Sequence, residues 1–172
     1  MQQGERNRNT VLRFFNEVMA LGSLEVLDEL SVDDYEDHVA LPGQGPGRAG
    51  LKQRVATIRA AFEPRQELHD VIADGDRVAV RWTLRGTHTG PFIGMPATGR
   101  PIEFDGVDLY AMRAGRIAAH WNVVGLWAFY QQVGGAVMEN TDSTSSADDE
   151  PERRSSLTSS SPSSAANVAM PD

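Results

Sequence analysis

The strongest constraint on the fold is the stretch 76–134, which reads as three strands in a row followed by a helical turn. Apolar and polar side chains alternate along its first part, a period of two that is typical of a strand with one buried face. The predicted buried face carries Val78, Val80, Trp82 and Leu84. Residues 102–112 and 116–124 form the next two runs, with Ala114 and Gly115 at the hairpin turn between them. We expect these strands to build a curved sheet, with the functional site on its concave face.

The residues before this stretch read mainly as helices. Helical spacing of apolar residues predicts helices over residues 5–21 and 48–62, and a short helix after Ser23 lies between them. The apolar stripe of the first helix contains Val11, Phe14, Phe15, Val18 and Met19. Residues 31–47 read as an acidic segment that runs into a Gly/Pro loop, and residues 66–73 as a strand. Helices first and antiparallel strands after them predict an α+β fold, with three helices covering the concave face of the sheet around an internal pocket.

Composition divides the chain into a globular domain over residues 1–134 and a Ser-rich, acidic tail over residues 135–172. The tail has too few apolar residues to bury, so it is expected to be disordered. It holds seven acidic and two basic residues, or −5 of the net charge of −8, which leaves −3 on the domain. A mildly acidic domain argues against nucleic-acid binding. The sequence has no cysteine and no apolar run of membrane-spanning length, so a cytoplasmic protein is expected.

Several motifs give the domain a resemblance to a known family. They are the His38 segment followed by PGRAG, the AFEP that ends the third predicted helix, the run RWTLRGTHTGPFIGMPATGRPIEF, and the finish RAGRIAAHWNVVGLWAFYQQVG. Over residues 10–134 the chain resembles the SnoaL-like polyketide cyclases, which share a fold with nuclear transport factor 2 and ketosteroid isomerase. The resemblance implies a cone-shaped α+β barrel, a deep apolar pocket, frequent homodimers, and neither a metal nor an organic cofactor. It also implies intramolecular aldol closure of polyketide esters in antibiotic biosynthesis.

One position departs from the family pattern. The usual ending resembles HWxxxDxxGLxxQLG, and its acid serves the cyclases as general acid and base. Counting from His120, that position is Gly125 in this chain. The standard cyclase mechanism therefore does not transfer directly. Relatives without this acid include some that are assigned to hydroxylation.

Asp108 is the first candidate for a replacement base, because it shares a strand face with Tyr110. If that face looks into the pocket, the carboxylate lies in an apolar cavity where it can accept a proton. The alternative is an outward Asp108 paired with an arginine such as Arg81. A bulge at Gly106 would reverse the alternation and bring Asp105 inward instead.

The other catalytic candidates are Asp37 and His38, which lie just before the Gly/Pro loop. A histidine and a carboxylate can act together as an acid and base, and a purely structural hydrogen bond is the alternative. Alternation in the last strand, counted back from Gly125, places Trp121 in the pocket and His120 outside it. His69 and His88 are expected to be solvated, and the four histidines show no metal-ligand spacing. The candidates for substrate contact are Phe15, Tyr35, Trp82, Tyr110, Trp121 and Asn122.

Three functional hypotheses follow. The first is a cofactor-independent enzyme of polyketide metabolism, a cyclase or isomerase that transfers protons on an apolar substrate with Asp108 as base. The second is an epoxide hydrolase or ether-forming cyclase in which Asp37 and Asp108 converge on one water or hydroxyl. The third is a non-catalytic or hydroxylation-associated protein, suggested by the glycine at position 125. The expected partners are a polyketide-like small molecule and a second copy of the chain.

Overall fold

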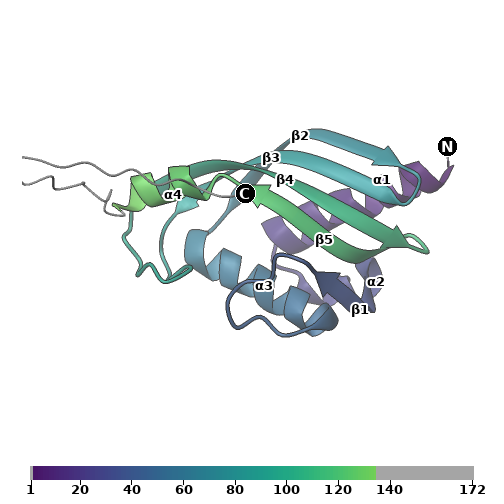
Figure 1. Cartoon of the computed structure of the whole chain (residues 1–172), viewed down its shortest axis with the longest axis horizontal. Coiled ribbons are helices and arrows are strands. Elements are labelled where there is room, and N and C mark those ends of the chain that lie inside the picture. The colour runs from purple at the N-terminus through teal and green to yellow at the C-terminus, as the bar shows by residue number, and fades with distance from the viewer. Residues whose placement is uncertain (1, 135–172) are drawn as a thin grey trace, which may run out of the picture. The chain divides into compact units, whose positions relative to one another are not determined.

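A computed structural model of the chain describes residues 2–134, which form a curved, open sheet with helices on one side (Figure 1). The predicted tail, residues 135–172, lies outside the described residues. The helices are α1 (Gln2–Arg13), α2 (Leu27–Leu30), α3 (Gly47–Phe62) and α4 (Leu126–Val133). Within residues 2–134, none of the helices has the length and apolarity needed to cross a membrane.

The sheet has five strands in the order β1-β5-β4-β3-β2. Their bounds are β1 (Ser31–Asp37), β2 (Arg65–Asp74), β3 (Arg77–Thr87), β4 (Pro101–Arg113) and β5 (Arg116–Val124). All neighbouring pairs are antiparallel except β1 and β5, which are parallel. The sequence predicted the α+β class and four of these strands, and both are confirmed.

The strand β1 was missed, because the sequence predicted only an acidic segment there. Its buried side chains are Ser31, Val32 and Tyr35, and the exposed positions between them are acidic. Too few apolar residues remain to show a period of two. The strand forms because its backbone pairs with β5, a contact between residues far apart in the sequence.

The first helix continues beyond α1 as a π-helical segment, Phe14–Ala20. The wider π-helical turn changes the direction in which successive side chains point. All five residues of the predicted apolar stripe are buried, so this prediction is confirmed. This helix and α3 lie across the concave side of the sheet (Figure 1).

Strand β4 keeps its alternation along its whole length. It pairs with β3 without interruption from Pro101 to Ala111, so there is no bulge at Gly106. Asp108 therefore lies on the inner face, and its side chain is 8 % exposed. Glycine is needed at position 106 for another reason: a Cβ there would lie 2.3 Å from Cζ2 of Trp82, whose indole ring lies over this position.

The loop between β3 and β4 is fixed by His88. We expected a solvated histidine, but His88 is fully buried against Phe62 and Phe129, and the expectation was wrong. Its Nδ1 lies 3.1 Å from Oγ1 of Thr98, within the same loop. The backbone N–H groups of Thr98 and Gly99 also donate to the carbonyl of His88. The loop is thereby anchored by its own histidine.

The outer face of the sheet exposes several apolar side chains. Val107 on β4 and Val123 on β5 are cross-strand partners, and they are 44 % and 77 % exposed. Leu109 lies beside them on the same face and is 38 % exposed. The homodimer implied by the family resemblance stays a prediction, and this face is where a second copy is to be sought.

Candidate active site

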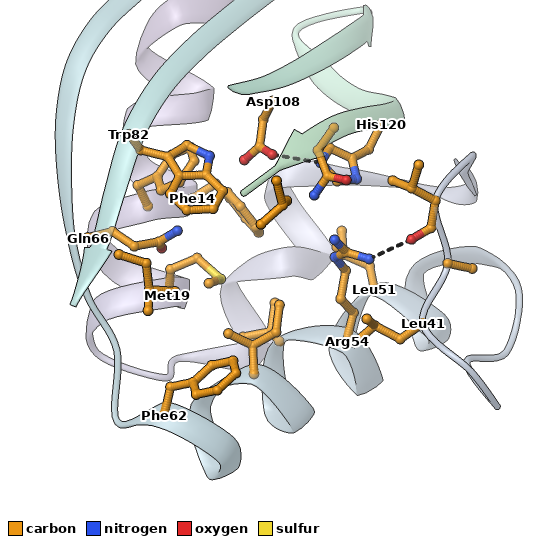
Figure 2. Close-up of a pocket in the computed structure, with 18 of the residues that line it drawn as sticks. Phe14, Met19, Leu41, Leu51, Arg54, Phe62, Gln66, Trp82, Asp108 and His120 are labelled. Atoms are coloured by element: carbon orange, nitrogen blue, oxygen red, sulfur yellow. Dashed lines mark hydrogen bonds and ion pairs between the residues drawn. The ribbon is translucent and has the colours of Figure 1, made fainter. Parts of the chain in front are cut away.

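A cavity of about 400 Å³ lies between the inner face of the sheet and the helices. This volume is within the usual range for sites that bind small organic molecules. Most of its lining is apolar or aromatic, and Phe92 and Ile93 of the loop held by His88 contribute to it. The lining also includes a few polar or charged side chains, which are Tyr35, Arg54, Gln66, Asp108, Tyr110, His120 and Asn122. Figure 2 labels four of them: Arg54, Gln66, Asp108 and His120.

A continuous hydrogen-bonded chain runs along one end of this cavity. His120 is its centre: Nδ1 lies 3.3 Å from Oδ1 of Asp37, and Nε2 lies 3.2 Å from Oδ1 of Asp108. The hydroxyl of Tyr110 donates to Oδ2 of Asp108 at 3.0 Å. Strand pairing produces this arrangement, because Asp37 and Tyr110 are the partners of His120 on β1 and β4. Asp108 is the next inward residue of β4.

Asp37 lies behind His120 and does not line the cavity. Its carboxylate accepts hydrogen bonds from Nε2 of Gln44 at 2.8 Å and from the backbone N–H of Val39 at 3.1 Å, and Nη1 of Arg54 lies 3.4 Å away. Burial by itself would raise the pKa of Asp37. The hydrogen bonds from His120 and Gln44, together with the charge of Arg54, outweigh burial and hold this pKa well below its usual range.

His120 has the opposite shift. Burial would lower the pKa of its imidazole, but the hydrogen bonds to Asp108 and Asp37 outweigh burial and raise it. The protonated ring can donate to both carboxylates at once. With Arg54 also charged, the buried cluster contains two positive and two negative groups. This balance is what allows four ionisable side chains to remain in an apolar surrounding.

Two tyrosines complete this end of the cavity. Burial and the nearby charge of Asp108 raise the pKa of Tyr110, and burial and the charge of Asp37 raise that of Tyr35. Both hydroxyls therefore keep their protons at neutral pH. The hydroxyl of Tyr110 donates its hydrogen bond to Asp108. The buried hydroxyl of Tyr35 has no hydrogen-bond partner among the described residues. Tyr35 also lines the cavity.

The predicted orientation of the last strand was wrong. The pairings Ala111–Ala119 and Met112–Ile117 leave Ala118 as an extra residue, a bulge that shifts the alternation. Beyond it His120, Asn122 and Val124 line the cavity, and Trp121 does not. Counting back from Gly125 gave the reverse assignment, because Gly125 is itself exposed and does not line the cavity.

His38 is also outside the cavity, contrary to the expectation for a catalytic residue. Alternation along the end of β1 buries the side chain of Asp37 and exposes that of His38. The ring of His38 stacks on Trp121, with centroids 4.2 Å apart, and lies near Glu36. The structural alternative, a side-chain hydrogen bond that fixes the loop, is not confirmed either, because the contacts described for this ring are the stack on Trp121 and the approach to Glu36.

The remaining candidates lie as follows. Phe15, Tyr35, Trp82, Tyr110 and Asn122 line the cavity, and their contact with a substrate stays a prediction. Asp105 is on the outer face, where it accepts a hydrogen bond from Thr83. Arg81 pairs with Asp70, so it does not bind Asp108.

Three polar residues of the cavity were missed in the sequence: Arg54, Gln66 and His120. Arg54 had a visible signal, because it lies within the apolar stripe of α3, between Leu51 and Val55. Gln66 had a similar signal at the start of β2, on the same face as Leu68. His120 had no such signal in the sequence, since the bulge in β5 that turns its side chain inward cannot be recognised from the alternation of apolar and polar residues. Within residues 2–134, no cluster of acidic, histidine or cysteine side chains suited to a metal ion occurs.

Comparison with known proteins agrees with this architecture. A family model described as SnoaL-like polyketide cyclase matches residues 9–133. IdmH from Streptomyces antibioticus, described as a candidate polyketide cyclase, is 31 % identical, with 74 % of this chain and 98 % of that chain covered and a TM-score of 0.63. TsrD from Streptomyces laurentii is 22 % identical, with coverages of 79 % and 98 % and a TM-score of 0.67. Comparison with curated protein sequences gave no match.

A further solved structure widens the range of described activities. AclR from Streptomyces galilaeus, described as a candidate hydroxylase, is 20 % identical, with 78 % of this chain and 88 % of that chain covered and a TM-score of 0.66. At this identity the likeness shows a shared fold. The fold and cavity define a small α+β protein of the nuclear transport factor 2 type. The chain belongs to the SnoaL-like polyketide cyclase family.

The raised pKa of His120 predicts a pH-dependent stability. A group whose pKa is higher in the folded state stabilises the fold fully below its unfolded pKa, about 6.5, and this contribution is lost as the pH rises through the folded pKa. The free energy of unfolding should therefore fall as the pH rises above about 6.5, by about 1.4 kcal/mol for each unit by which the pKa is raised. In His120→Gln this fall should be absent.

Urea denaturation at pH 6, 7, 8 and 9 measures this difference. His38→Gln is the matched control, because it removes a histidine outside the cavity and should keep the wild-type dependence. A His120→Gln protein with the same pH profile as the wild type would contradict the assignment of a charged His120.

Proposed function

We propose that the protein catalyses cofactor-independent proton transfer at a carbon next to a carbonyl group, in a largely apolar, polyketide-like substrate. The reaction is a cyclisation or isomerisation, with Asp108 as general base. The observation that supports this most is the buried chain Asp37–His120–Asp108, whose Asp108 end opens on an apolar cavity.

The environment of Asp108 suits a base. Each of its oxygens accepts one hydrogen bond, from His120 or Tyr110, and each keeps a lone pair that can accept a proton. Most of the cavity lining is apolar, so few protein groups other than His120 and Tyr110 compete with a substrate for the carboxylate. His120 and Tyr110 fix the orientation of the carboxylate, which favours proton transfer from a substrate held in one position.

The steps can be written with these groups alone. Asp108 takes the proton from the carbon next to the carbonyl, and the electron pair moves onto the carbonyl oxygen. The hydroxyl of Tyr35 is the available donor for this developing oxyanion. In a cyclisation, the enolate carbon then attacks a second carbonyl carbon of the same molecule, and the resulting alkoxide takes the proton from Asp108. In an isomerisation, the proton returns to a different carbon.

The other two hypotheses have less support. An epoxide-opening site needs Asp37 and Asp108 on one water or hydroxyl, but the imidazole of His120 lies between them. A non-catalytic module would be expected to have a shallow or filled cone, whereas this cavity has a volume of about 400 Å³ and is lined in part by ionisable groups. Hydroxylation is suggested only by a neighbour that shares the fold at 20 % identity.

Hydrogen exchange of a simple ketone tests the proposal without knowledge of the substrate. The probes are 2-tetralone and a methyl ester of an aromatic β-keto acid, incubated with the protein in D2O and followed by NMR. Deuterium should enter at the acidic carbon faster than in buffer, and the rate should saturate with probe concentration. Saturable binding of both probes with exchange no faster than in buffer would contradict proton transfer.

A further inference from the structure

We propose that Ile93 is a specificity-determining residue, which contacts an apolar ring of the substrate at the end of the cavity away from Asp108. Ile93 lies in the loop between β3 and β4, in the run PFIGMP that forms part of the family resemblance. The inference adds a substrate class to the proposed function: an elongated molecule with an apolar ring beyond its reacting carbonyl. It rests on that function only for the end bound at Asp108.

The backbone at Ile93 has an unfavourable conformation. Phe92 and Met95 exchange two backbone hydrogen bonds, each of 2.9 Å, which close a two-residue turn over Ile93 and Gly94. Both turn residues have a positive φ, 39° at Ile93 and 84° at Gly94, as a type I′ turn requires. Asparagine, aspartate and glycine suit the first position of such a turn. A β-branched residue with a positive φ is an outlier, so the isoleucine costs stability here.

The loop around this turn is fixed by contacts on both sides of it, so the strain is not released by movement of the loop. The backbone N–H groups of Thr89 and Gly90 donate to the carbonyl of Ala61 near the end of α3, at 2.9 and 3.2 Å. Phe92 is 7 % exposed, and its ring packs edge-on against Phe62. Strained residues persist only where the surrounding structure holds them, and they concentrate at active sites and ligand sites.

A second turn of the same kind shows what is unusual about Ile93. Ala114 and Gly115, between β4 and β5, also have positive φ values, 51° and 79°. Ala114 is exposed and does not line the cavity, and it has a small side chain. Ile93 lines the cavity, and its partial burial leaves apolar surface for a ligand. The large side chain therefore occurs at the turn where it borders the cavity. Packing against the protein core alone is the alternative, and the experiment below separates the two.

This turn lies at the end of the cavity opposite the base. Phe92, the neighbour of Ile93, and Phe104 on β4 both pack on Phe62, with ring centroids 4.6 and 5.9 Å from that of Phe62. Phe104 and Asp108 are inward residues of β4 separated by four positions, or about 13 Å along the strand. Figure 2 shows Phe62 and Asp108 at opposite ends of the cavity. A substrate that reaches both ends therefore has the length of two or three rings.

Binding of two phenols to the full chain, measured by calorimetry, tests this contact. The second ring of biphenyl-4-ol can reach Ile93 when the hydroxyl is bound at Asp108, whereas phenol is too short. In Ile93→Asn and Ile93→Gly the Kd of biphenyl-4-ol should rise about tenfold, as expected for the loss of an apolar side chain from a ring contact. The Kd of phenol should stay unchanged. Ala114→Asn is the matched control, because it changes the first position of the other turn, and it should bind both probes like the wild type.

The proposal is overturned if the wild type binds biphenyl-4-ol no more tightly than phenol, or if both Ile93 variants bind it like the wild type. Equal losses for the two probes would place the contact beside Asp108 and overturn it as well. Asparagine and glycine both suit the turn, so thermal unfolding should show Tm values close to the wild type.

A large fall of Tm in both variants would make Ile93 a core residue and reject the proposal. Phenol binding does not depend on turnover. Absent ketone exchange with an intact effect of Ile93 on biphenyl-4-ol would therefore reject the proton-transfer function and keep this contact.

Discussion

Replacing Asp108 by asparagine is expected to slow deuterium exchange into 2-tetralone by about 10²–10⁴-fold, the usual contribution of a positioned general base. Asparagine has nearly the same shape as aspartate and can still accept a hydrogen bond from Tyr110, so the fold should be kept. It cannot take a proton from carbon at neutral pH. The loss should therefore appear in the rate of exchange, with little change in the affinity for a neutral ligand such as biphenyl-4-ol.

Asp105→Asn is the matched control for this prediction. It makes the same chemical change on the same strand, three residues away, but on the outer face of the sheet. It should leave the exchange rate within about twofold of the wild type, as expected of a group that never contacts the substrate. An Asp108→Asn protein that exchanges as fast as Asp105→Asn would remove Asp108 from the mechanism.

The two faces of β4 could be predicted in part, because its alternation is regular. Every second residue from Ile102 to Met112 is buried, and this period put Asp108 and Tyr110 on one face, but it left open whether that face looks into the cavity. The hypothesis of a bulge at Gly106 was reasonable, since a glycine within a strand often marks one. The actual reason for this glycine is the indole ring of Trp82, which is distant in the sequence and cannot be identified from local pattern.

The centre of the site could not be predicted, for two physical reasons. The bulge in β5 reverses the inward face between Ile117 and His120, and nothing in the short run of small residues there marks it. The strand β1 exists through pairing with β5, so the approach of Asp37 to His120 depends on a contact between distant segments. The sequence therefore provided both carboxylates as separate candidates, without the imidazole that joins them.

This geometry also changes the meaning of the glycine at position 125. From the sequence, its presence suggested a lost catalytic acid. In the structure Gly125 is an exposed residue at the end of β5 whose backbone N–H donates to the carbonyl of Asp105. The cavity has its own carboxylate, Asp108, on the neighbouring strand. Absence of the family acid at this position is therefore compatible with acid–base chemistry from β4 and β5.

Replacing Arg54 by methionine is expected to lower the free energy of unfolding by about 3 kcal/mol, the low end of the range for breaking a buried ion pair. Arg54 and Asp37 are both nearly buried, and their side chains are 11 % and 5 % exposed. Methionine is apolar and similar in length, so it fills most of the same space. The loss should come from the charge that remains, because His120 alone would then balance two carboxylates.

Urea denaturation at pH 7 measures this loss, and two further proteins identify its cause. Arg85→Met makes the same change in an exposed ion pair on the outer face and should have a far smaller effect, because solvent screens such pairs. Asp37→Asn introduced into Arg54→Met should recover part of the stability, since it removes the unbalanced negative charge. If Arg54→Met is no less stable than Arg85→Met, the charges of this cluster are not balanced as proposed.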